Sequence, residues 1–402
     1  MPNTATNAFV ARTDSVLDEL RATGQYKELQ VLEGPMDATV TLKGYGECLC
    51  FCSNNYLGLA NHPEVVEAGH RGLTDFGAGT ASVRFICGTF SPHLALEKRI
   101  STFLGVEAAY TFVSCWNANE AIFPTLCEPG DLIISDELNH ASIIDGVRLA
   151  CVIKKGLNKA VFKHNDHDDL RAKLTKARAN LGPTSALWVV TDGVFSMEGD
   201  LPDLPGLRAV CDEFGAILVV DDSHGTGVMG KTGRGTHEHF GMPGSSIDFF
   251  TGTLGKALGG AAGGYIAGSK NAIDLIVQRG RPTLFSNALP VTVAFSAAKA
   301  IEILDREPQR VQKLRDNVAY ARKRLAEAGF DVTPSPTAIC PIIVGETAKA
   351  ISMSKRLLEL GVFVIGFGYP VVPEGAARLR VQISAAHDTE HIEGLIDALN
   401  KL

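Results

Sequence analysis

The sequence predicts an α/β protein with a mostly parallel sheet in a large domain and a smaller C-terminal α+β domain. Apolar runs in the centre of the chain alternate with helical patterns, and strands separated by helices favour a parallel sheet covered on both faces. The last third changes to long helical patterns with a few short strand-like runs. The chain has 402 residues, which is enough for two or three domains.

The elements of the large domain follow from these runs. The first ~45 residues are expected to form a helical arm and a short hairpin. Buried parallel strands are predicted at Ala108–Val113, Asp131–Ser135, Ala186–Thr191, Ala216–Val220 and Asp248–Thr251. Helical patterns lie between them, for example at Asp166–Asn180 and Leu204–Phe214. Right-handed crossovers should connect the strands.

The smaller domain is predicted from the last third of the chain. Val291–Phe330 is a nearly continuous helical pattern, and short strand-like runs follow at Ala338–Val344 and Gly361–Ile365. Another helical segment lies between these runs, and Glu390–Leu399 is expected to be the final helix. We therefore expect an N-terminal arm and hairpin over residues 1–50, a large domain over 51–290 and a small domain over 291–402.

Composition limits the possible partners and location. The net charge of −7 gives no electrostatic footprint for nucleic acid, and no apolar run approaches the ~18–20 residues needed to span a membrane. No secretory signal is recognisable at the N-terminus. Nine scattered cysteines suit a reducing cytosol, so we expect a cytoplasmic protein. Cys48, Cys50 and Cys52 are interpreted as buried apolar residues rather than zinc ligands, because no second ligand cluster accompanies them.

An acid and a histidine follow one of the predicted strands. Ala216–Val220 runs directly into Asp221 and, three residues on, His224. Ligands of open α/β sheets bind beyond the carboxyl ends of the strands, so both side chains can face such a site. The alternative is that Asp221 only caps the next helix.

A lysine among glycines follows the next predicted strand. In Gly252-Thr253-Leu254-Gly255-Lys256-Ala257 the spacing between the glycines is too short for a Walker A loop, and no Ser or Thr follows the lysine. A lysine that holds a cofactor as a Schiff base fits better, because small neighbours leave room for an aromatic ring. The alternative is a solvent-exposed lysine.

A glycine pattern nearby resembles a dinucleotide-binding motif. Gly225–Gly230 fits GxGxxG and follows a strand, but Lys231–Gly235 is a loop sequence where the motif requires a helix. We therefore do not expect NAD binding.

Together these residues predict a pyridoxal 5′-phosphate (PLP) site without a metal. A carboxylate keeps the pyridine nitrogen of PLP protonated, and Asp221 is placed to do so. His224 and Ser196 could donate to the phenolic oxygen, and His140 could stack on the ring. A phosphate needs N–H groups at a helix start, which the Ser114–Trp116 segment offers. The residues expected at the phosphate are Ser114, Cys115, Trp116 and, through its hydroxyl, Thr253.

The motifs resemble those of the α-oxoamine synthases, PLP-dependent enzymes of fold type I that condense an amino acid with an acyl-CoA. The resemblance rests on Asp221–Gly227, Thr253–Gly260, Phe51–Pro63, Ala81–Thr89 and Asn139–Leu149. It extends from about Leu17 to about Ala398. Within the family, these segments are most similar to members that condense glycine with acetyl-CoA, a reaction whose reverse completes threonine breakdown to glycine.

The resemblance implies roles for individual residues. Lys256 would be the Schiff-base lysine, Asp221 would pair with the ring nitrogen, His140 would stack, and His224 with Ser196 would flank the phenolic oxygen. Cys115, Trp116 and Thr253 would hold the phosphate. Asn54 and Arg380 would bind the amino acid carboxylate, for which the planar fork of Arg is suited. Ser286 would reach the cofactor phosphate of a neighbouring subunit, so a homodimer with shared sites is implied.

Some alternatives stay open at this point. Trp116, Asn117, Glu120 and Phe90 depart from the family pattern and leave the acyl donor and the amino acid undecided. Another α-oxoamine synthase reaction, such as alanine with a pimeloyl thioester or serine with palmitoyl-CoA, is one alternative. A PLP aldolase that acts without CoA is a second, and a cofactor-free interaction protein is a third.

Overall fold

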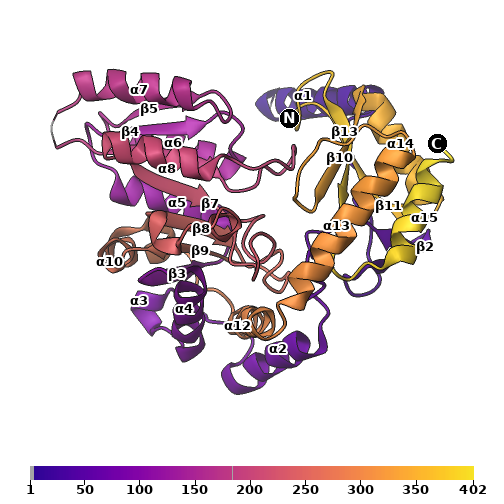
Figure 1. Cartoon of the computed structure of the whole chain (residues 1–402), viewed down its shortest axis with the longest axis horizontal. Helices are drawn as coiled ribbons and strands as arrows, with labels where there is room; N and C mark the ends of the chain where they lie inside the picture. Colours follow the sequence, from indigo (N-terminus) through magenta and orange to yellow (C-terminus); the bar gives the residue numbers. More distant parts are fainter. Residues whose placement is uncertain (1–3, 183) are drawn as a thin grey trace.

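The centre of the molecule is a seven-stranded sheet, seen in a computed structural model that describes residues 4–182 and 184–402 (Figure 1). In spatial order the strands are β3 (Ala108–Phe112), β9 (Gly264–Gly268), β8 (Phe249–Thr253), β7 (Ile217–Asp221), β6 (Leu187–Asp192), β4 (Leu132–Asp136) and β5 (Asn158–Phe162). Only β9 is antiparallel to its neighbours, and the other strands all run in one direction. The predicted mostly parallel sheet is confirmed.

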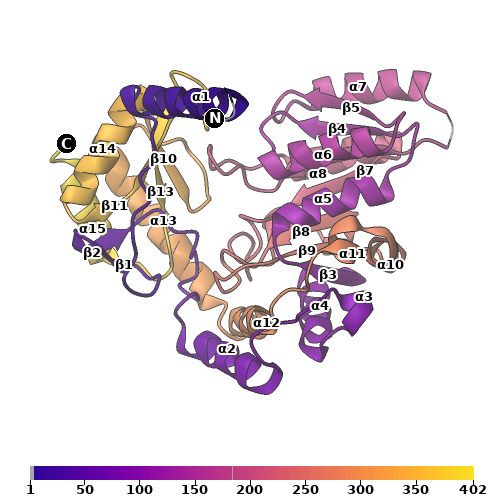
Figure 2. The ribbon, with the colours of Figure 1, turned by 180° about the vertical axis from the view of Figure 1, so that it is seen from behind.

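Helices cover both faces of this sheet. One face packs against α5 (Cys115–Leu126), α6 (Ala141–Ile153) and α10 (Lys270–Arg279); the other packs against α4 (Ser91–Leu104), α7 (His167–Asn180), α8 (Leu204–Phe214) and α12 (Val291–Arg306). α8 lies in front of the sheet in Figure 1, and α5 lies in front of it in Figure 2. Because both faces are covered, every residue of β6 is buried, and its first four residues are an unbroken apolar run.

A second, smaller lobe contains the C-terminal part of the chain (Figure 1). Its antiparallel sheet has the order β10 (Ile339–Gly345), β13 (Ala377–Gln382) and β12 (Ile365–Phe367). The helices of this part are α13 (Gln309–Glu327), α14 (Thr347–Glu359) and α15 (Thr389–Leu399). All six residues of β13 are buried, so this strand is the centre of the lobe.

The N-terminal segment joins this lobe. After α1 (Thr4–Ala22), the hairpin of β1 (Thr39–Leu42) and β2 (Gly46–Cys50) is extended by β11 (Val362–Phe363), which pairs parallel to β2. α12 instead packs against α2 (Pro63–Phe76) and α4 at the large sheet. The domain boundaries near residues 50 and 290 stay predictions. The short helices are α3 (Arg84–Cys87), α9 (Thr236–His239), η1 (Gly244–Ser246) and α11 (Arg281–Phe285).

Two predicted elements are divided in the structure. The run at Gly361–Ile365 is split between β11 and β12, which belong to different sheets. The continuous helical pattern over Val291–Phe330 is divided into α12 and α13, which are separated by Glu307 and Pro308. Proline has no N–H to donate and its ring clashes with the preceding turn, so the chain begins a new helix there.

The GxGxxG segment is a loop, as expected, and its first glycine, together with Gly235 beyond the segment, packs against a buried carboxylate. Asp222 accepts hydrogen bonds from the Thr226 hydroxyl at 3.0 Å, the Thr236 N–H at 3.1 Å and the Thr236 hydroxyl. A Cβ atom on Gly225 or Gly235 would lie 2.0 Å from an Asp222 oxygen. Burial raises the pKa of Asp222 to about 6. The glycines are therefore required for packing around Asp222.

The cysteines are free thiols, and Cys48 and Cys50 pack in a small apolar cluster with Val40, Leu42 and Leu358. Within the described part of the chain, no group of His, Cys, Asp or Glu side chains has an arrangement that could hold a metal ion. No helix there has the length and apolar character needed to cross a membrane.

Candidate active site

The strand ends of the large sheet converge on one cavity of about 230 Å³. Cys115 follows β3, and Asp192, Asp221 and Thr253 are the last residues of β6, β7 and β8. The cavity is lined by Cys115, Trp116, His140, Ser142, Asp192, Val194, Ser196, Asp221, Ser223, His224, Thr253 and Lys256. Parallel strands bring their carboxyl ends to one edge, so residues distant in sequence meet there. The structure thus brings together most of the residues predicted at the cofactor.

Lys256 lies on a bend directly after β8, and its amine faces His224. The distance from Lys256 Nζ to His224 Nε2 is 2.8 Å. Burial lowers the pKa of Lys256 to about 8, although the Asp221 charge opposes the shift. Burial, together with the charge of Lys256, also lowers the pKa of His224 well below its ordinary value. The lysine therefore has a substantial neutral fraction near pH 7–8, as a nucleophilic or basic amine requires.

Asp221 is buried but stays ionised. Its carboxylate accepts a hydrogen bond from Asn119 Nδ2 at 2.7 Å and one from the Ser223 N–H at 3.0 Å. Burial acts to raise the pKa of Asp221, but these hydrogen bonds and the charges of His140 and Lys256 outweigh it and leave the pKa lowered. A fixed negative charge of this kind can hold a proton on a ring nitrogen.

The neighbouring carboxylate, Asp192, is in the opposite state. It pairs with Asp221 in the register of β6 and β7 and accepts a hydrogen bond from the His140 N–H at 3.1 Å. Burial and the charge of Asp221 raise the pKa of Asp192 well above its ordinary value. Two adjacent carboxyl groups whose pKa values are pushed apart are typical of an active site.

The ring of His140 is oriented by its neighbours at the mouth of the cavity. His140 is the N-cap of α6, and its Nδ1 lies 2.7 Å from Ser142 Oγ. The ring of Trp116 meets it edge-on, with centroids 6.2 Å apart. The imidazole is therefore a fixed flat surface beside the Lys256 amine, as stacking on an aromatic ring requires.

The start of α5 forms the end of the cavity at which a phosphate is expected. The Ser114 hydroxyl caps α5 by accepting from the Asn117 N–H at 3.2 Å, and Ser114 does not line the cavity. The first N–H groups of a helix have no partner inside the helix, so those of Cys115 and Trp116 can bind an anion. A Cβ on Gly264 of β9 would lie 2.3 Å from the Cys115 nitrogen, so this close approach requires glycine.

Arg380 and Asn54 lie together beside the cavity, although neither lines it. Arg380 is only 8% exposed, and its buried Nε has no hydrogen-bond partner among the described residues. The amide of Asn54 lies 2.6 Å from the amide of Gln382, which also contacts Arg380 and Tyr56. A buried cation with unused donor capacity is suited to a substrate carboxylate.

The two remaining predicted residues, Ser196 and Ser286, lie in different places. Ser196 lines the cavity. Ser286, directly after α11, instead lines separate hollows with Asn117 and Pro282 and does not face the Lys256 of its own chain.

Sequence reasoning did not assign roles to Tyr56, Asn119 or Asp192. Asp192 is the last residue of a strand, as Asp221 is. Asn119 lies one helical turn after Cys115, so both residues could be found from the sequence pattern. Tyr56, whose hydroxyl lies 2.8 Å from His224 Nδ1, had no local signal because it is 168 residues away in sequence.

These residues fit PLP. The cavity offers an amine for the Schiff base, an ionised carboxylate, a flat imidazole and a helix start for the phosphate. Lys256, Asp221, His140 and the N–H groups of Cys115 and Trp116 are therefore the residues that would hold the cofactor.

The comparisons with known proteins agree with this geometry. The family model for class I and II aminotransferases matches residues 46–399. A 2-amino-3-ketobutyrate coenzyme A ligase of Salmonella typhimurium is 42% identical, over 98% of this chain and 97% of the relative. An 8-amino-7-oxononanoate synthase of Alkaliphilus metalliredigens is 41% identical, over 96% and 95%. A structure of SPT with PLP as its internal aldimine superposes with a TM-score of 0.88 at 28% identity, covering 99% and 97%.

Proposed function

Because the chain belongs to the class I and II aminotransferase family and, within it, to the α-oxoamine synthases, we propose that it condenses glycine with acetyl-CoA. The products are 2-amino-3-oxobutyrate and CoA, and the reverse reaction would complete threonine breakdown to glycine. The observation that carries this proposal is the meeting of Lys256, Asp221 and His224 at one cavity, beside the buried Arg380. The enzyme is PLP-dependent.

PLP supplies an electron-accepting ring that stabilises negative charge on the α-carbon of a bound amino acid. The ionised Asp221 holds a proton on the ring nitrogen, which maintains that capacity. His140 would cover the ring face, His224 and Ser196 would lie at the phenolic oxygen, and Thr253 with the start of α5 would bind the phosphate. These assignments are supported by the shared cavity and by the charge state of Asp221.

Lys256 moves the proton of the α-carbon. Its amine lines the cavity, and burial lowers its pKa to about 8, so the fraction of neutral amine that can accept a proton rises from about a tenth at pH 7 to about half at pH 8. The α-carbon of glycine would form a bond to the acetyl carbonyl carbon, the C–S bond would break, and CoA would leave as its thiolate. His140 is placed to donate to the oxygen on which negative charge develops.

Arg380 and Asn54 bind the glycine carboxylate. Arg380 is buried, its guanidinium lies 3.2 Å from the amide oxygen of Gln382, and its Nε has no protein partner among the described residues. A bidentate contact would fix the amino acid with its α-carbon towards Lys256.

A second candidate is the condensation of alanine with a pimeloyl thioester. The sequence identity of this chain to an 8-amino-7-oxononanoate synthase is 41%, which is close to its identity of 42% to the 2-amino-3-ketobutyrate coenzyme A ligase. Identity alone therefore does not separate the two reactions, and the amino acid and acyl chain need a direct assay.

The enzyme works as a cytoplasmic homodimer with shared sites. Support comes from the nine free cysteines, which suit a reducing compartment, and from an exposed apolar patch on α3 and α11. Phe85, Ile86 and Phe285 in this patch are 63%, 65% and 76% exposed. A patch of large apolar side chains is typical of an interface, and it adjoins Ser286, which does not face the cofactor cavity of its own chain.

The test is CoA release, measured with each pairing of glycine, alanine, serine or threonine with acetyl-CoA or a pimeloyl thioester. We expect glycine with acetyl-CoA to give the highest kcat/KM. A preference for alanine with the pimeloyl thioester would support the second candidate. Cleavage of threonine that does not depend on CoA would replace both with an aldolase.

A further inference from the structure

A continuous line of buried polar contacts runs from the Lys256 amine to the small lobe. Lys256 Nζ lies 2.8 Å from His224 Nε2, and His224 Nδ1 lies 2.8 Å from the Tyr56 hydroxyl. The Tyr56 hydroxyl in turn lies 2.9 Å from the side-chain amide of Gln382 on β13. Tyr56 and Gln382 are each 1% exposed, so water does not compete for these contacts.

The Cys52 carbonyl and Arg380 set the direction of the Gln382 amide. One of its atoms lies 2.5 Å from the Cys52 carbonyl oxygen and must be the NH₂ group, because two oxygens at that distance repel. The other atom lies 3.2 Å from Arg380 Nη2, a donor, and must be the oxygen. The Gln382 oxygen then lies 2.6 Å from the amide of Asn54, which must present its NH₂ group there, so the two amides turn together. The reverse orientation would leave buried polar groups facing groups of the same kind, which is costly in a dry environment.

This direction fixes the position of each proton along the line. A hydrogen bond holds one proton, and Gln382 Oε1 has none, so the Tyr56 hydroxyl donates to Gln382. The Tyr56 oxygen is then an acceptor, and the proton between Tyr56 and His224 must belong to His224 Nδ1. His224 Nε2 is left without a proton towards Lys256, which donates to it.

We propose that Gln382, acting through Tyr56, holds a proton on Nδ1 of His224, so that Nε2 is the nitrogen that exchanges protons within the active site. Gln382 and Tyr56 are positioning residues in this arrangement. The Cys52 carbonyl and Arg380 set the direction of the line, which links the orientation of the arginine to the protonation of His224.

The arrangement has a consequence for the base, which rests on the proposed function. When the Lys256 amine is free, Nε2 accepts one of its N–H groups and leaves the nitrogen lone pair available for the α-proton of the substrate. The opposite tautomer would donate its Nε2 proton to that lone pair and block the base. Loss of Gln382 is therefore expected to lower kcat.

The test is ¹⁵N NMR of the full chain labelled only in histidine, before and after loading with PLP. The His224 signals are assigned by their loss in His224→Gln. In the wild type we expect a protonated Nδ1 in both forms. Gln382→Met keeps the side-chain length and removes the acceptor, so the Tyr56 proton turns to Nδ1 and the His224 proton moves to Nε2. Tyr265→Phe is the matched control: it removes a buried hydroxyl that lies 3.1 Å from Thr226, and the signals should not change.

An unprotonated Nδ1 in the wild type, or an unchanged Nδ1 proton in Gln382→Met, overturns the proposal. If Gln382→Met does not fold, Tyr56→Phe decides: an Nε2-protonated population supports the proposal, and complete retention of the Nδ1 proton overturns it. The tautomer is observed without turnover. Failure of the wild type to condense glycine with acetyl-CoA would therefore refute the proposed function and leave this result standing.

Discussion

The two carboxyl groups at the ends of β6 and β7 show how surroundings assign different roles to one residue type. Asp221 accepts hydrogen bonds from Asn119 and Ser223 and stays ionised, whereas Asp192 has its pKa raised by burial and by the charge of Asp221. Their adjacency in the sheet means that only one negative charge is stable there. The residue that keeps the charge is the one that we propose pairs with the ring nitrogen of PLP.

Replacement of Asp221 therefore has a larger effect than replacement of Asp192. Asp221→Asn removes the charge that holds the ring proton, and we expect kcat to fall roughly 10²–10³-fold, as when a main electrostatic contact is removed. The absorbance spectrum of the bound cofactor should also change. Asp192→Asn replaces a protonated acid with a neutral group of similar shape and should cost much less. Equal losses in the two variants would contradict this assignment.

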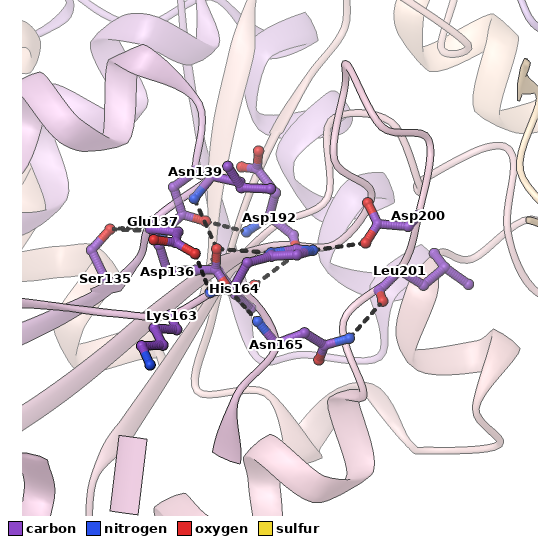
Figure 3. A network of polar contacts seen from close by, with 12 residues as sticks. Ser135, Asp136, Glu137, Asn139, Lys163, His164, Asn165, Asp192, Asp200 and Leu201 are labelled. Carbon is purple, nitrogen blue, oxygen red and sulfur yellow. Dashed lines mark hydrogen bonds and ion pairs between the residues drawn. The ribbon is translucent and has the colours of Figure 1, made fainter. Parts of the chain in front are cut away.

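At the scale of the elements, a polar network joins the ends of neighbouring strands (Figure 3). His164, after β5, lies 3.0 Å from Asp136 at the end of β4 and 2.7 Å from Asp200 in the loop after β6. Asn139 donates to the Val190 carbonyl and accepts from the Asp192 N–H. These contacts fix the segment that carries His140, so the residue proposed to stack on the PLP ring is held by several strands.

The network predicts a pH-dependent contribution to stability. Burial acts to lower the pKa of His164, but the hydrogen bonds to Asp136 and Asp200 outweigh it and raise the pKa to about 10. Because the pKa of His164 is higher in the folded protein than in the unfolded chain, its protonation stabilises the fold. This stabilisation is complete below the unfolded pKa of about 6.5 and is lost as the pH rises towards 10.

Urea unfolding of His164→Gln tests this contribution. We expect a loss of roughly 1.5–3 kcal/mol at pH 6, the usual range for hydrogen bonds to charged groups, and a smaller difference from the wild type at pH 10. His167→Gln is the control, because the ion-pair contact of His167 with Asp203 is long, at 3.6 Å. A difference that grows with pH would show that His164 is neutral in the folded protein.

The contact between β9 and the start of α5 gives a second prediction at this scale. Gly264→Ala would push a methyl group against the Cys115 nitrogen, at 2.3 Å in the present structure, and displace the phosphate-binding end of the helix. An overpacking cost of about 1–3 kcal/mol corresponds to a roughly ten- to hundredfold weaker Kd for PLP. Gly79→Ala, where a Cβ has open space, should leave the Kd unchanged. Equal Kd values for PLP in the wild type, Gly264→Ala and Gly79→Ala would show that the contact between β9 and α5 does not support the phosphate-binding end of the helix.

Most strands were predictable, and the exceptions have physical causes. β6 and β7 are buried on both faces and read as apolar runs, which located Asp221. β9 was missed because Gly264–Gly268 follows a glycine-rich turn without a break in composition. β5 was missed because three of its five residues are exposed at the sheet edge. The role of Tyr56 depends on the contact between distant segments, which no local pattern reports.

At the scale of the whole molecule, the site depends on parts that are far apart in sequence. The cofactor residues come from the large sheet, whereas Arg380 and Gln382 come from β13 of the smaller lobe. The order of the lobes was predictable from the change in pattern after residue 290. The pairing of the N-terminal hairpin with β11 was not, because it joins residues more than 300 positions apart.

Dimerisation is the prediction that belongs to this scale. Phe285→Glu places a charge in the exposed apolar patch, so we expect the mass in solution to fall from twice the chain mass of 42.8 kDa to one chain mass. Activity should fall with it, because the partner's contribution at Ser286 is lost. Val161→Glu, on the exposed edge strand β5, is the control and should stay dimeric. A wild-type protein of one chain mass would contradict the shared-site proposal.

The most direct measurement is borohydride reduction of the PLP-loaded protein, followed by mass analysis of its peptides. The account predicts a single phosphopyridoxyl group on the peptide that contains Lys256, and no stable label in Lys256→Ala. A label on another lysine, or none on a protein that folds normally, would contradict the assignment of this cavity as the cofactor site.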